Sequence, residues 1–376
     1  MTLSFVFGLI ALAGIIFTTV QALLTRRFRK TRALPARHTD FVSILKPVCG
    51  LDDELEENLL SFVALRGIGY EVIVSAEDES DPALAVVERV MRAHPEAPFR
   101  VVIDAGSREG VVNRKVERLI AAARAARGEI LFISDSNVRV EAEDFAKTLS
   151  AFDDRTVGCV SNLFTGSGAR TTGAVLESLH LLGFVVPGAV LAAAAGVPCV
   201  VGKSMAISRR ALSAIGGFER FRRVLAEDQA IGIAVKRAGY EIVLSPVVVR
   251  NVVVQRSIGR AVDRQVRWNK IRYAFSRPLY AGELLLNPLV FALLAWACAP
   301  TAFAAFPLLI VLARYLQFAL LARATRSGMT WVQLAAVPLL DVAMFYAWLI
   351  PFVSNSVTWR GYEARIGRGT ELLEQA

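Results

Sequence analysis

The stretch that decides the fold is EILFISDSN, residues 129–137. Its run of four apolar residues, ended by polar ones, predicts a buried strand that carries Asp135 and Asn137 just beyond its end. Because side chains at positions i and i+2 of an extended chain share one face, both could approach a hard divalent cation that also touches a diphosphate. A turn aspartate is the competing interpretation of Asp135.

Similar runs rich in Val, Ile and Phe surround this stretch and predict further strands. Apolar residues at helical spacing lie between them. The alternation indicates an α/β domain with a mostly parallel sheet, which binds ligands at the carboxyl ends of its strands. The other predicted strands are residues 41–45, 70–76 and 99–104, and the predicted helices are residues 53–65, 83–93 and 113–127.

The composition indicates a membrane protein. Of the 376 residues, 54% are hydrophobic, which is a larger fraction than a soluble domain needs for its core. Charges concentrate between about residues 40 and 280, so we predict an anchor and basic linker (1–37), a central domain (38–280), and membrane helices with a basic tail (281–376). The net charge of +9 suits anionic headgroups or phosphorylated ligands rather than nucleic acid.

The first apolar stretch, residues 3–24, is long enough to cross a bilayer as a helix. A cleaved signal peptide is the competing interpretation. The basic cluster at residues 26–30 follows directly, so the positive-inside rule places the central domain in the cytoplasm. Together with the apolar stretches near the other end, this helix predicts a multi-pass integral membrane protein.

Three apolar stretches near the other end, at residues 284–298, 301–321 and 331–353, predict a small membrane bundle. Arg314 and Asp341 lie inside it, and we expect them to pair or to face a polar cavity. Snorkelling of Arg314 is the alternative. A further apolar stretch, residues 183–202, contains Pro187 and Pro198, so we predict a loop packed against the membrane or lining an acceptor groove.

Two other acidic sites stand out. Asp78 follows the predicted strand at 70–76, where a carboxylate can accept hydrogen bonds from a ribose or a uracil ring. The alternative role, as N-cap of a helix that begins at Pro82, suits Asp81 better than Asp78. Glu227 and Asp228 precede a predicted helix at 230–237. Such an acidic pair also stabilises a helix start, so capping is its alternative role.

A basic and aromatic motif follows at RQVRW, residues 264–268. Arg264 and Arg267 share one helical face and could clamp a diphosphate, while Trp268 could form the floor of a sugar or lipid site. By itself the motif is also typical of a basic amphipathic helix near a membrane. Gly202-Lys203-Ser204 lacks the upstream glycine of a P-loop, so we predict no P-loop there.

Taken in order, these motifs resemble the D, D, D, (R/Q)xxRW signature of the GT-A glycosyltransferases, and most closely the ceramide glucosyltransferases of glycosyltransferase family 21. The likeness covers nearly the whole chain. It implies a GT-A domain, with a Rossmann-like mostly parallel sheet, between an N-terminal transmembrane anchor and C-terminal membrane helices. It also includes LKPVCG (45–50), Asn113-x-Lys115, CVVGxS (199–204), GGF (216–218) and Trp359-Arg360.

The resemblance implies an inverting transfer of glucose from UDP-glucose to ceramide, giving a β-glycoside. Asp228 would be the base. Asp78 and Lys115 would bind the nucleoside, Asp135 would hold the diphosphate and Mg²⁺ or Mn²⁺, Arg264 and Arg267 would steady the diphosphate, and Trp268 and Glu227 would contact the acceptor.

The sequence departs from the family pattern at two places. Asn137 stands where many GT-A enzymes have the second Asp of DxD, and Val186-Pro187 stands where animal ceramide glucosyltransferases have His-Pro. Three alternatives also stay open, because they share this architecture, motif or fold: a hopanoid or other lipid glycosyltransferase using UDP-N-acetylglucosamine, a processive polysaccharide synthase, and a non-catalytic membrane scaffold. A bacterial inner membrane is the expected location.

Overall fold

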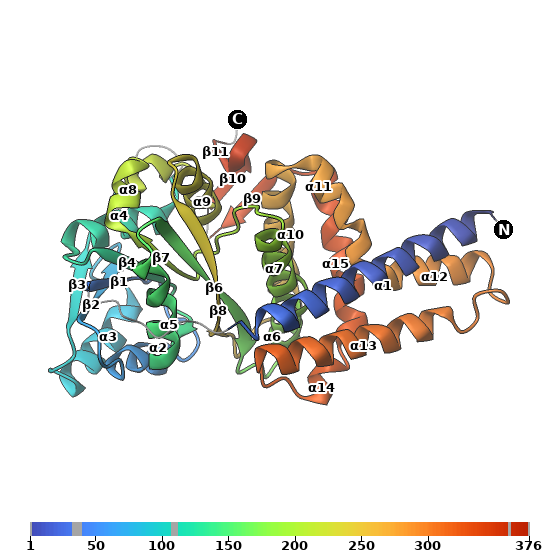
Figure 1. The fold of residues 1–376 in the computed structure, drawn as a ribbon, viewed down its shortest axis with the longest axis horizontal. Helices are drawn as coiled ribbons and strands as arrows, with labels where there is room; N and C mark the ends of the chain where they lie inside the picture. Colours follow the sequence, from blue (N-terminus) through green and yellow to red (C-terminus); the bar gives the residue numbers. More distant parts are fainter. Residues whose placement is uncertain (1, 32–39, 107–111, 360–361, 375–376) are drawn as a thin grey trace. The chain divides into compact units, whose positions relative to one another are not determined.

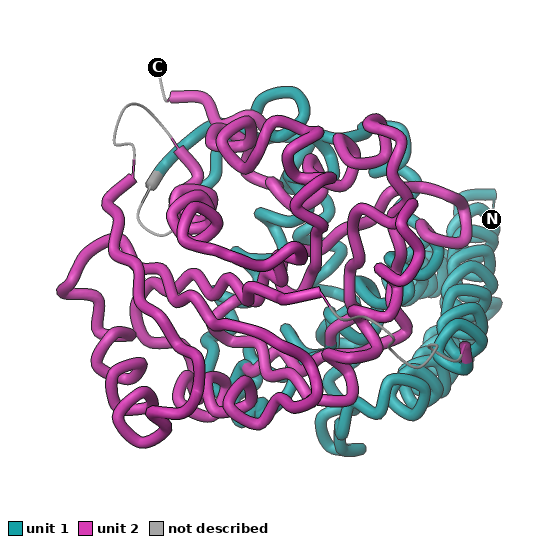
Figure 2. The backbone as a smooth tube through the Cα atoms, turned by 60° about the vertical axis from the view of Figure 1, so that its left-hand side comes forward, with its two compact units in different colours: residues 1–30, 165–191, 253–370 teal, residues 31–164, 192–252, 371–376 magenta. Residues whose placement is uncertain are grey.

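The computed structural model describes residues 2–31, 40–106, 112–359 and 362–374 (Figure 1). The chain forms two compact units, which Figure 2 colours separately. Unit 1 comprises residues 1–30, 165–191 and 253–370, and unit 2 comprises residues 31–164, 192–252 and 371–376. The predicted boundary after residue 37 lies outside the described residues, and the one after residue 280 stays a prediction about domain organisation.

Unit 2 contains an eight-stranded sheet in the order β3-β2-β1-β4-β7-β6-β8-β5. Strands β3, β2, β1 and β4 run parallel, whereas β7 is antiparallel to β4 and to β6. The four predicted strands and the α/β class are confirmed. The strands are β1 (Val42–Pro47), β2 (Tyr70–Ala76), β3 (Phe99–Ile103), β4 (Ile130–Ser134), β5 (Val138–Arg139), β6 (Val157–Ser167), β7 (Ser204–Ser208) and β8 (Glu241–Val252).

Helices cover both faces of this sheet, with α4, α8 and α9 on one face and α2, α3 and α5 on the other (Figure 1). On the first face Leu119, Ile133 and Ile231 belong to one buried apolar cluster. Asp81 caps α3 through the backbone N–H of Ala83, as expected. The helices are α2 (Leu55–Val63), α3 (Pro82–Ala93), α4 (Arg114–Ala125), α5 (Ala142–Leu149), α8 (Arg209–Ala214) and α9 (Glu227–Arg237).

Unit 1 is mostly helical and carries the apolar segments. Among the described residues three helices are long and apolar enough to cross a membrane, or four if the bent pair Arg277–Leu286 and Pro288–Cys298 is one span. The elements are α1 (Thr2–Phe28), α6 (Thr172–His180), α7 (Val186–Ala194), α10 (Ile258–Phe275), α11 (Arg277–Gly282), α12 (Pro288–Cys298), α13 (Phe306–Thr325), α14 (Trp331–Leu334), α15 (Val337–Leu349) and the antiparallel pair β9 (Ser356–Trp359) and β10 (Tyr362–Ile366).

The predicted loop at residues 183–202 is wrong over residues 183–194, which are helical. A π-helical turn, Leu181–Val185, joins α6 to α7 and changes the hydrogen-bond spacing just before Pro187, so the missing N–H of this proline does not end the helix. Gly183 permits close packing rather than a break, because a Cβ there would lie 2.2 Å from the ring of Phe318. Residues 195–202 form neither helix nor strand.

The two charges inside the apolar C-terminal helices pair with each other. Arg314 of α13 donates to both carboxylate oxygens of Asp341 on α15, at 3.0 and 2.8 Å, and both side chains are almost fully buried. Arg314 donates a third hydrogen bond to Gln317 Oε1 at 3.0 Å, and Gln317 in turn donates to Thr19 of α1 at 2.7 Å. The expected pairing is confirmed, and snorkelling of Arg314 is not observed.

Candidate functional site

Asp135 directly follows β4 at the carboxyl end of the parallel strands. The backbone there is fixed by Lys46 of β1, whose Nζ donates to Asp135 O at 2.8 Å and lies 3.3 Å from Val138 O. Lys46 is fully buried, and this burial lowers its pKa to about 7 against the opposing effect of the Asp135 charge. Sequence reasoning places Lys46 in a motif but does not assign it to the site.

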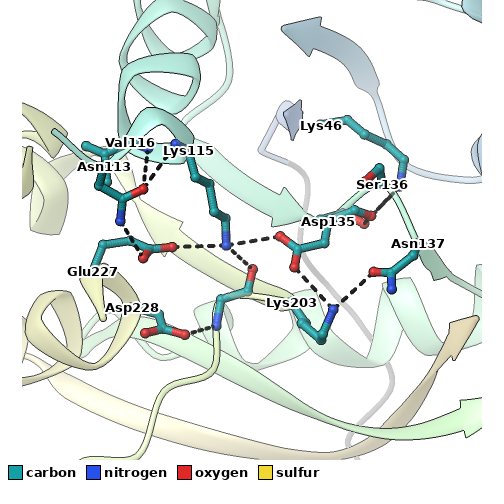
Figure 3. Close-up of polar contacts among 12 residues, drawn as sticks. Lys46, Asn113, Lys115, Val116, Asp135, Ser136, Asn137, Lys203, Glu227 and Asp228 are labelled. Atoms are coloured by element: carbon teal, nitrogen blue, oxygen red, sulfur yellow. Dashed lines mark hydrogen bonds and ion pairs between the residues drawn. The ribbon is translucent and has the colours of Figure 1, made fainter. Parts of the chain in front are cut away.

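Lys115, in the first turn of α4, joins the two acidic motifs (Figure 3). Its Nζ lies 3.0 Å from Asp135 Oδ1, 3.0 Å from Glu227 Oε1 and 3.2 Å from Gly202 O. The three ammonium protons therefore have three acceptors. Burial opposes the charged form of Lys115, yet the neighbouring Asp135 and Glu227 carboxylates raise its pKa above the usual value. The two carboxylates thus favour the charged form of Lys115.

Asn113 and Glu227 connect the starts of α4 and α9. The Asn113 side chain caps α4 by accepting from the backbone N–H of Lys115 at 3.0 Å, and its amide donates to Glu227 Oε2 at 3.1 Å. The Glu227 carboxylate is thus occupied from both sides, by Asn113 and by Lys115. Its burial raises its pKa, and the charge of Lys115 opposes this effect.

Asp228 lies beside this cluster and is half-buried, without an ion pair to Lys115 among the described contacts. Its Oδ2 accepts from Gly202 N at 2.6 Å, and its Oδ1 accepts from Gln229 N at 2.8 Å. Glycine at position 202 suits this close approach, because a Cβ there would lie 3.0 Å from both Asp228 Cβ and Lys115 Nζ. The first turn of α9 therefore presents two carboxylates in different environments.

Lys203 completes the cluster and was missed by sequence reasoning. Its Nζ lies 3.4 Å from Asp135 Oδ2 and 3.0 Å from Asn137 Oδ1. The available signal is the Gly202-Lys203-Ser204 tripeptide, which the missing upstream glycine excludes as a P-loop. Burial alone would raise the pKa of Asp135, but the charges of Lys115 and Lys203 hold it well below its usual range. Asp135 therefore lies between two lysine side chains, and burial lowers the pKa of Lys203 against the opposing effect of the Asp135 charge.

A metal ion would find few ligands here without a substrate. The described part of the chain contains no group of three or more His, Cys, Asp or Glu side chains that could hold one. Asp135 and Asn137 offer a carboxylate and an amide oxygen. Mg²⁺ is commonly bound by one or two carboxylates together with substrate phosphates, so these residues fit a divalent cation only in combination with a phosphate-bearing ligand.

Asp78, predicted to bind the nucleoside, lies exposed beyond the end of β2. Its Oδ1 accepts from the backbone N–H of Ser80 at 2.8 Å and from the Ser80 hydroxyl. The preceding Glu77 pairs with Arg114 of α4. Both hydrogen bonds from Ser80 to Asp78 are local to the turn after β2, and the assignment of Asp78 to the nucleoside stays a prediction.

The RQVRW motif lies on α10 in unit 1 and forms a second cluster. Arg264 pairs with the buried carboxylate of Glu177 on α6, and its guanidinium lies 4.5 Å from the centroid of the Trp268 ring. Trp268 also makes an edge contact with His180, with 5.8 Å between ring centroids, and Arg267 is half-buried on the same helix. Glu177 was missed, although an acid within the apolar residues 172–194 is an available signal.

Comparisons with known proteins bear on the family and the fold of the chain. A sequence profile described as "Glycosyl transferase family 21" matches residues 6–372. Ceramide glucosyltransferases 1 and 3 of Caenorhabditis elegans are 27% and 25% identical over 307 and 302 residues, which are 74% and 76% of this chain and 61% and 60% of theirs. The chain thus spans less than two thirds of the length of these relatives.

One solved structure shares the fold over nearly the whole chain. It is a mannosyltransferase from Pyrobaculum calidifontis in complex with GDP-Man and Mn²⁺, with a TM-score of 0.51 and 19% identity, covering 92% of this chain and 99% of that one. At this identity the likeness shows the fold alone. Together with the profile match it confirms the predicted α/β fold class of a glycosyltransferase.

Proposed function

Because the chain belongs to glycosyltransferase family 21, we propose that it transfers a sugar, glucose in the first instance, from a UDP-sugar to the hydroxyl of a membrane lipid such as ceramide. The observation that carries this proposal is the cluster at the carboxyl ends of β1 and β4, where Lys115 joins Asp135 to the acidic pair that begins α9. Such strand ends are where α/β sheets bind nucleotides.

The geometry supports separate roles for the two halves of this cluster. Asp228 would take the proton from the acceptor hydroxyl. None of the described ion pairs joins its carboxylate to a lysine, and the hydrogen bonds that it accepts come from the backbone N–H groups of Gly202 and Gln229. The hydroxyl oxygen would bond to the anomeric carbon as the bond from that carbon to the UDP oxygen breaks, giving a β-glycoside. Lys115 would place positive charge near the departing diphosphate.

The remaining assignments follow the family resemblance. Asp78 would contact the nucleoside, Arg264 and Arg267 would steady the diphosphate, and Trp268 and Glu227 would contribute to the acceptor site. Asp135 and Asn137 would hold Mg²⁺ or Mn²⁺ together with phosphate oxygens, and the cation would supply charge neutralisation when bound. Glu177 would fix the orientation of Arg264.

Lipid analysis tests the proposal directly. The full chain is expressed in a host that lacks glycolipids, and new products are identified by mass spectrometry. A hexose on a sphingolipid supports the proposal as stated, whereas an N-acetylhexosamine on a hopanoid establishes the alternative lipid transferase. A polymer would indicate a polysaccharide synthase. If neither transfer nor hydrolysis of UDP-sugars occurs, the chain is a non-catalytic scaffold.

We also propose that unit 2 faces the cytoplasm of a bacterial inner membrane. Arg26 and Arg27 in the last turn of α1 favour a cytoplasmic end for this helix. Labelling of single cysteines with a membrane-impermeant reagent in inverted vesicles should modify unit 2 and spare it in intact cells. The opposite pattern would contradict this orientation.

We predict that transfer depends on a divalent cation, because Asp135 and Asn137 fit one only in combination with a diphosphate. Exhaustive chelation should lower the transfer rate by at least about tenfold, and Mn²⁺ or Mg²⁺ should restore it. The measurement is product formation at saturating donor. Full activity after chelation would show that the lysine and arginine side chains neutralise the diphosphate by themselves.

We predict that Trp268→Ala lowers lipid transfer steeply while donor hydrolysis by water and the melting temperature are largely kept, as expected if this side chain contacts the acceptor. Trp268→Phe, which keeps an aromatic face toward Arg264, is the matched control. If Trp268 only packs in the core, all three properties should be lost together, because deletion of a packed Trp typically costs about 3–5 kcal/mol of stability. That result would assign Trp268 to packing against His180 and Arg264.

A further inference from the structure

Lys203 contacts Asp135 and Asn137, the two residues whose side-chain oxygens would bind the metal ion in the proposed function (Figure 3). Its Nζ is 3.0 Å from Asn137 Oδ1 and 3.4 Å from Asp135 Oδ2. The fold brings these residues together because β7 pairs antiparallel with β4, with Ser204 opposite Ser134. The backbone N–H of Asp135 donates to Lys203 O at 3.1 Å, which fixes the two segments further.

The other carboxylate oxygen of Asp135 faces a second ammonium group, that of Lys115, at 3.0 Å. Each of these side-chain oxygens thus has a cationic partner within the protein. A divalent ion that binds Asp135 and Asn137 must replace Lys203 there, because like charges repel strongly at such short range in a partly buried site. The Lys203 side chain is only 13% exposed, so water screens this repulsion poorly.

We propose that Lys203 is an internal cation that competes with the divalent metal ion for Asp135 and Asn137, and that the diphosphate of the nucleotide draws it away. The metal ion then binds well only when the nucleotide is present. This inference rests on the proposed function, in which Asp135 is the metal ligand and the diphosphate binds beside it.

The proposal gives Lys203 two opposite effects. In the absence of nucleotide its ammonium lowers the affinity for metal, because it holds the same oxygens. In the absence of metal it raises the affinity for a nucleoside diphosphate, because it is a cation beside the phosphates. A residue that only maintains the fold would change both affinities in the same direction.

The test uses the purified full chain with Lys203 replaced by Met, which keeps much of the volume and removes the charge. Mn²⁺ binding without nucleotide is measured by electron paramagnetic resonance of the free ion, and UDP binding is measured calorimetrically in chelator. We expect Mn²⁺ to bind about tenfold more tightly and UDP about tenfold more weakly, within the roughly 5- to 150-fold range of coupling between linked sites.

Two controls separate the charge of Lys203 from general effects. Lys147→Met removes a positive charge from the same unit at a partly exposed ion pair with Glu143, and it should change neither affinity. Lys203→Arg keeps the charge and should bind Mn²⁺ as weakly as the unsubstituted protein. If Lys203→Met does not fold, Lys203→Gln is measured in the same way with the same expected directions.

Unchanged or weaker Mn²⁺ binding by the neutral variants would overturn the proposal. Adding Asp135→Asn to Lys203→Met distinguishes this from a failure of the proposed function. If the double variant binds Mn²⁺ as tightly as Lys203→Met, the metal ion is held elsewhere and the assignment of Asp135 is wrong. If the double variant loses the gained affinity, Asp135 is the ligand with which Lys203 competes.

Discussion

Asp228→Asn should lower the rate of sugar transfer by roughly 10² to 10⁴ while the affinity for the UDP-sugar stays within a few-fold. The amide cannot accept the proton of the acceptor hydroxyl, but this side chain is not one of those that we assign to the nucleotide. Asn can also keep one of the two backbone hydrogen bonds that Asp228 accepts, from Gly202 and Gln229. The measurements are single-turnover transfer and UDP-sugar binding.

Glu227→Gln is the matched comparison, because it neutralises the neighbouring carboxylate in the same helical turn. Glu227 pairs with Lys115 at 3.0 Å and accepts from Asn113 at 3.1 Å, so we expect its loss to affect the arrangement of the site rather than the proton transfer. Near-normal turnover of Asp228→Asn, with Glu227→Gln inactive, would reverse the two assignments. Melting temperatures of both variants show whether either has lost the fold.

Four of the eight strands of the sheet could be predicted from the sequence because they are short apolar runs with polar ends. The run at residues 130–133 placed β4, and with it Asp135, without any knowledge of the rest of the chain. Strands of a parallel sheet are buried on both faces, so a continuous hydrophobic run directly predicts such a strand. The pairing of Arg314 with Asp341 was predictable for a related reason, since unpaired charges in apolar helices are costly.

The partners of Asp135 could not be predicted in the same way. Lys203 lies 68 positions further along the chain and reaches Asp135 through an antiparallel strand pairing, which no local periodicity encodes. Glu177 reaches Arg264 from a helix that continues into residues 183–194, where Pro187 and two glycines favour a loop. Pro187 is tolerated because of the π-helical turn before it, which is a matter of backbone hydrogen bonding rather than of composition.

Lys115→Met should remove both stability and activity, because Lys115 is the cation that two carboxylates share. Asp135 and Glu227 each lie 3.0 Å from its Nζ, with side chains 24% and 8% exposed. Removal of one partner from a buried ion pair typically costs about 3–5 kcal/mol, since the remaining charge stays desolvated. We expect a lower melting temperature in detergent and at least about a hundredfold loss of transfer.

Comparison with Glu227→Gln identifies the cause of that loss. If Lys115 acts mainly as the counter-ion of Glu227, the double variant Lys115→Met/Glu227→Gln should melt above Lys115→Met alone, because the uncompensated carboxylate is gone. Transfer should not recover, since the positive charge near the diphosphate is still missing. Recovery of both properties would mean that Lys115 serves only the fold, and an unchanged melting temperature in Lys115→Met would mean that these ion pairs do not stabilise it.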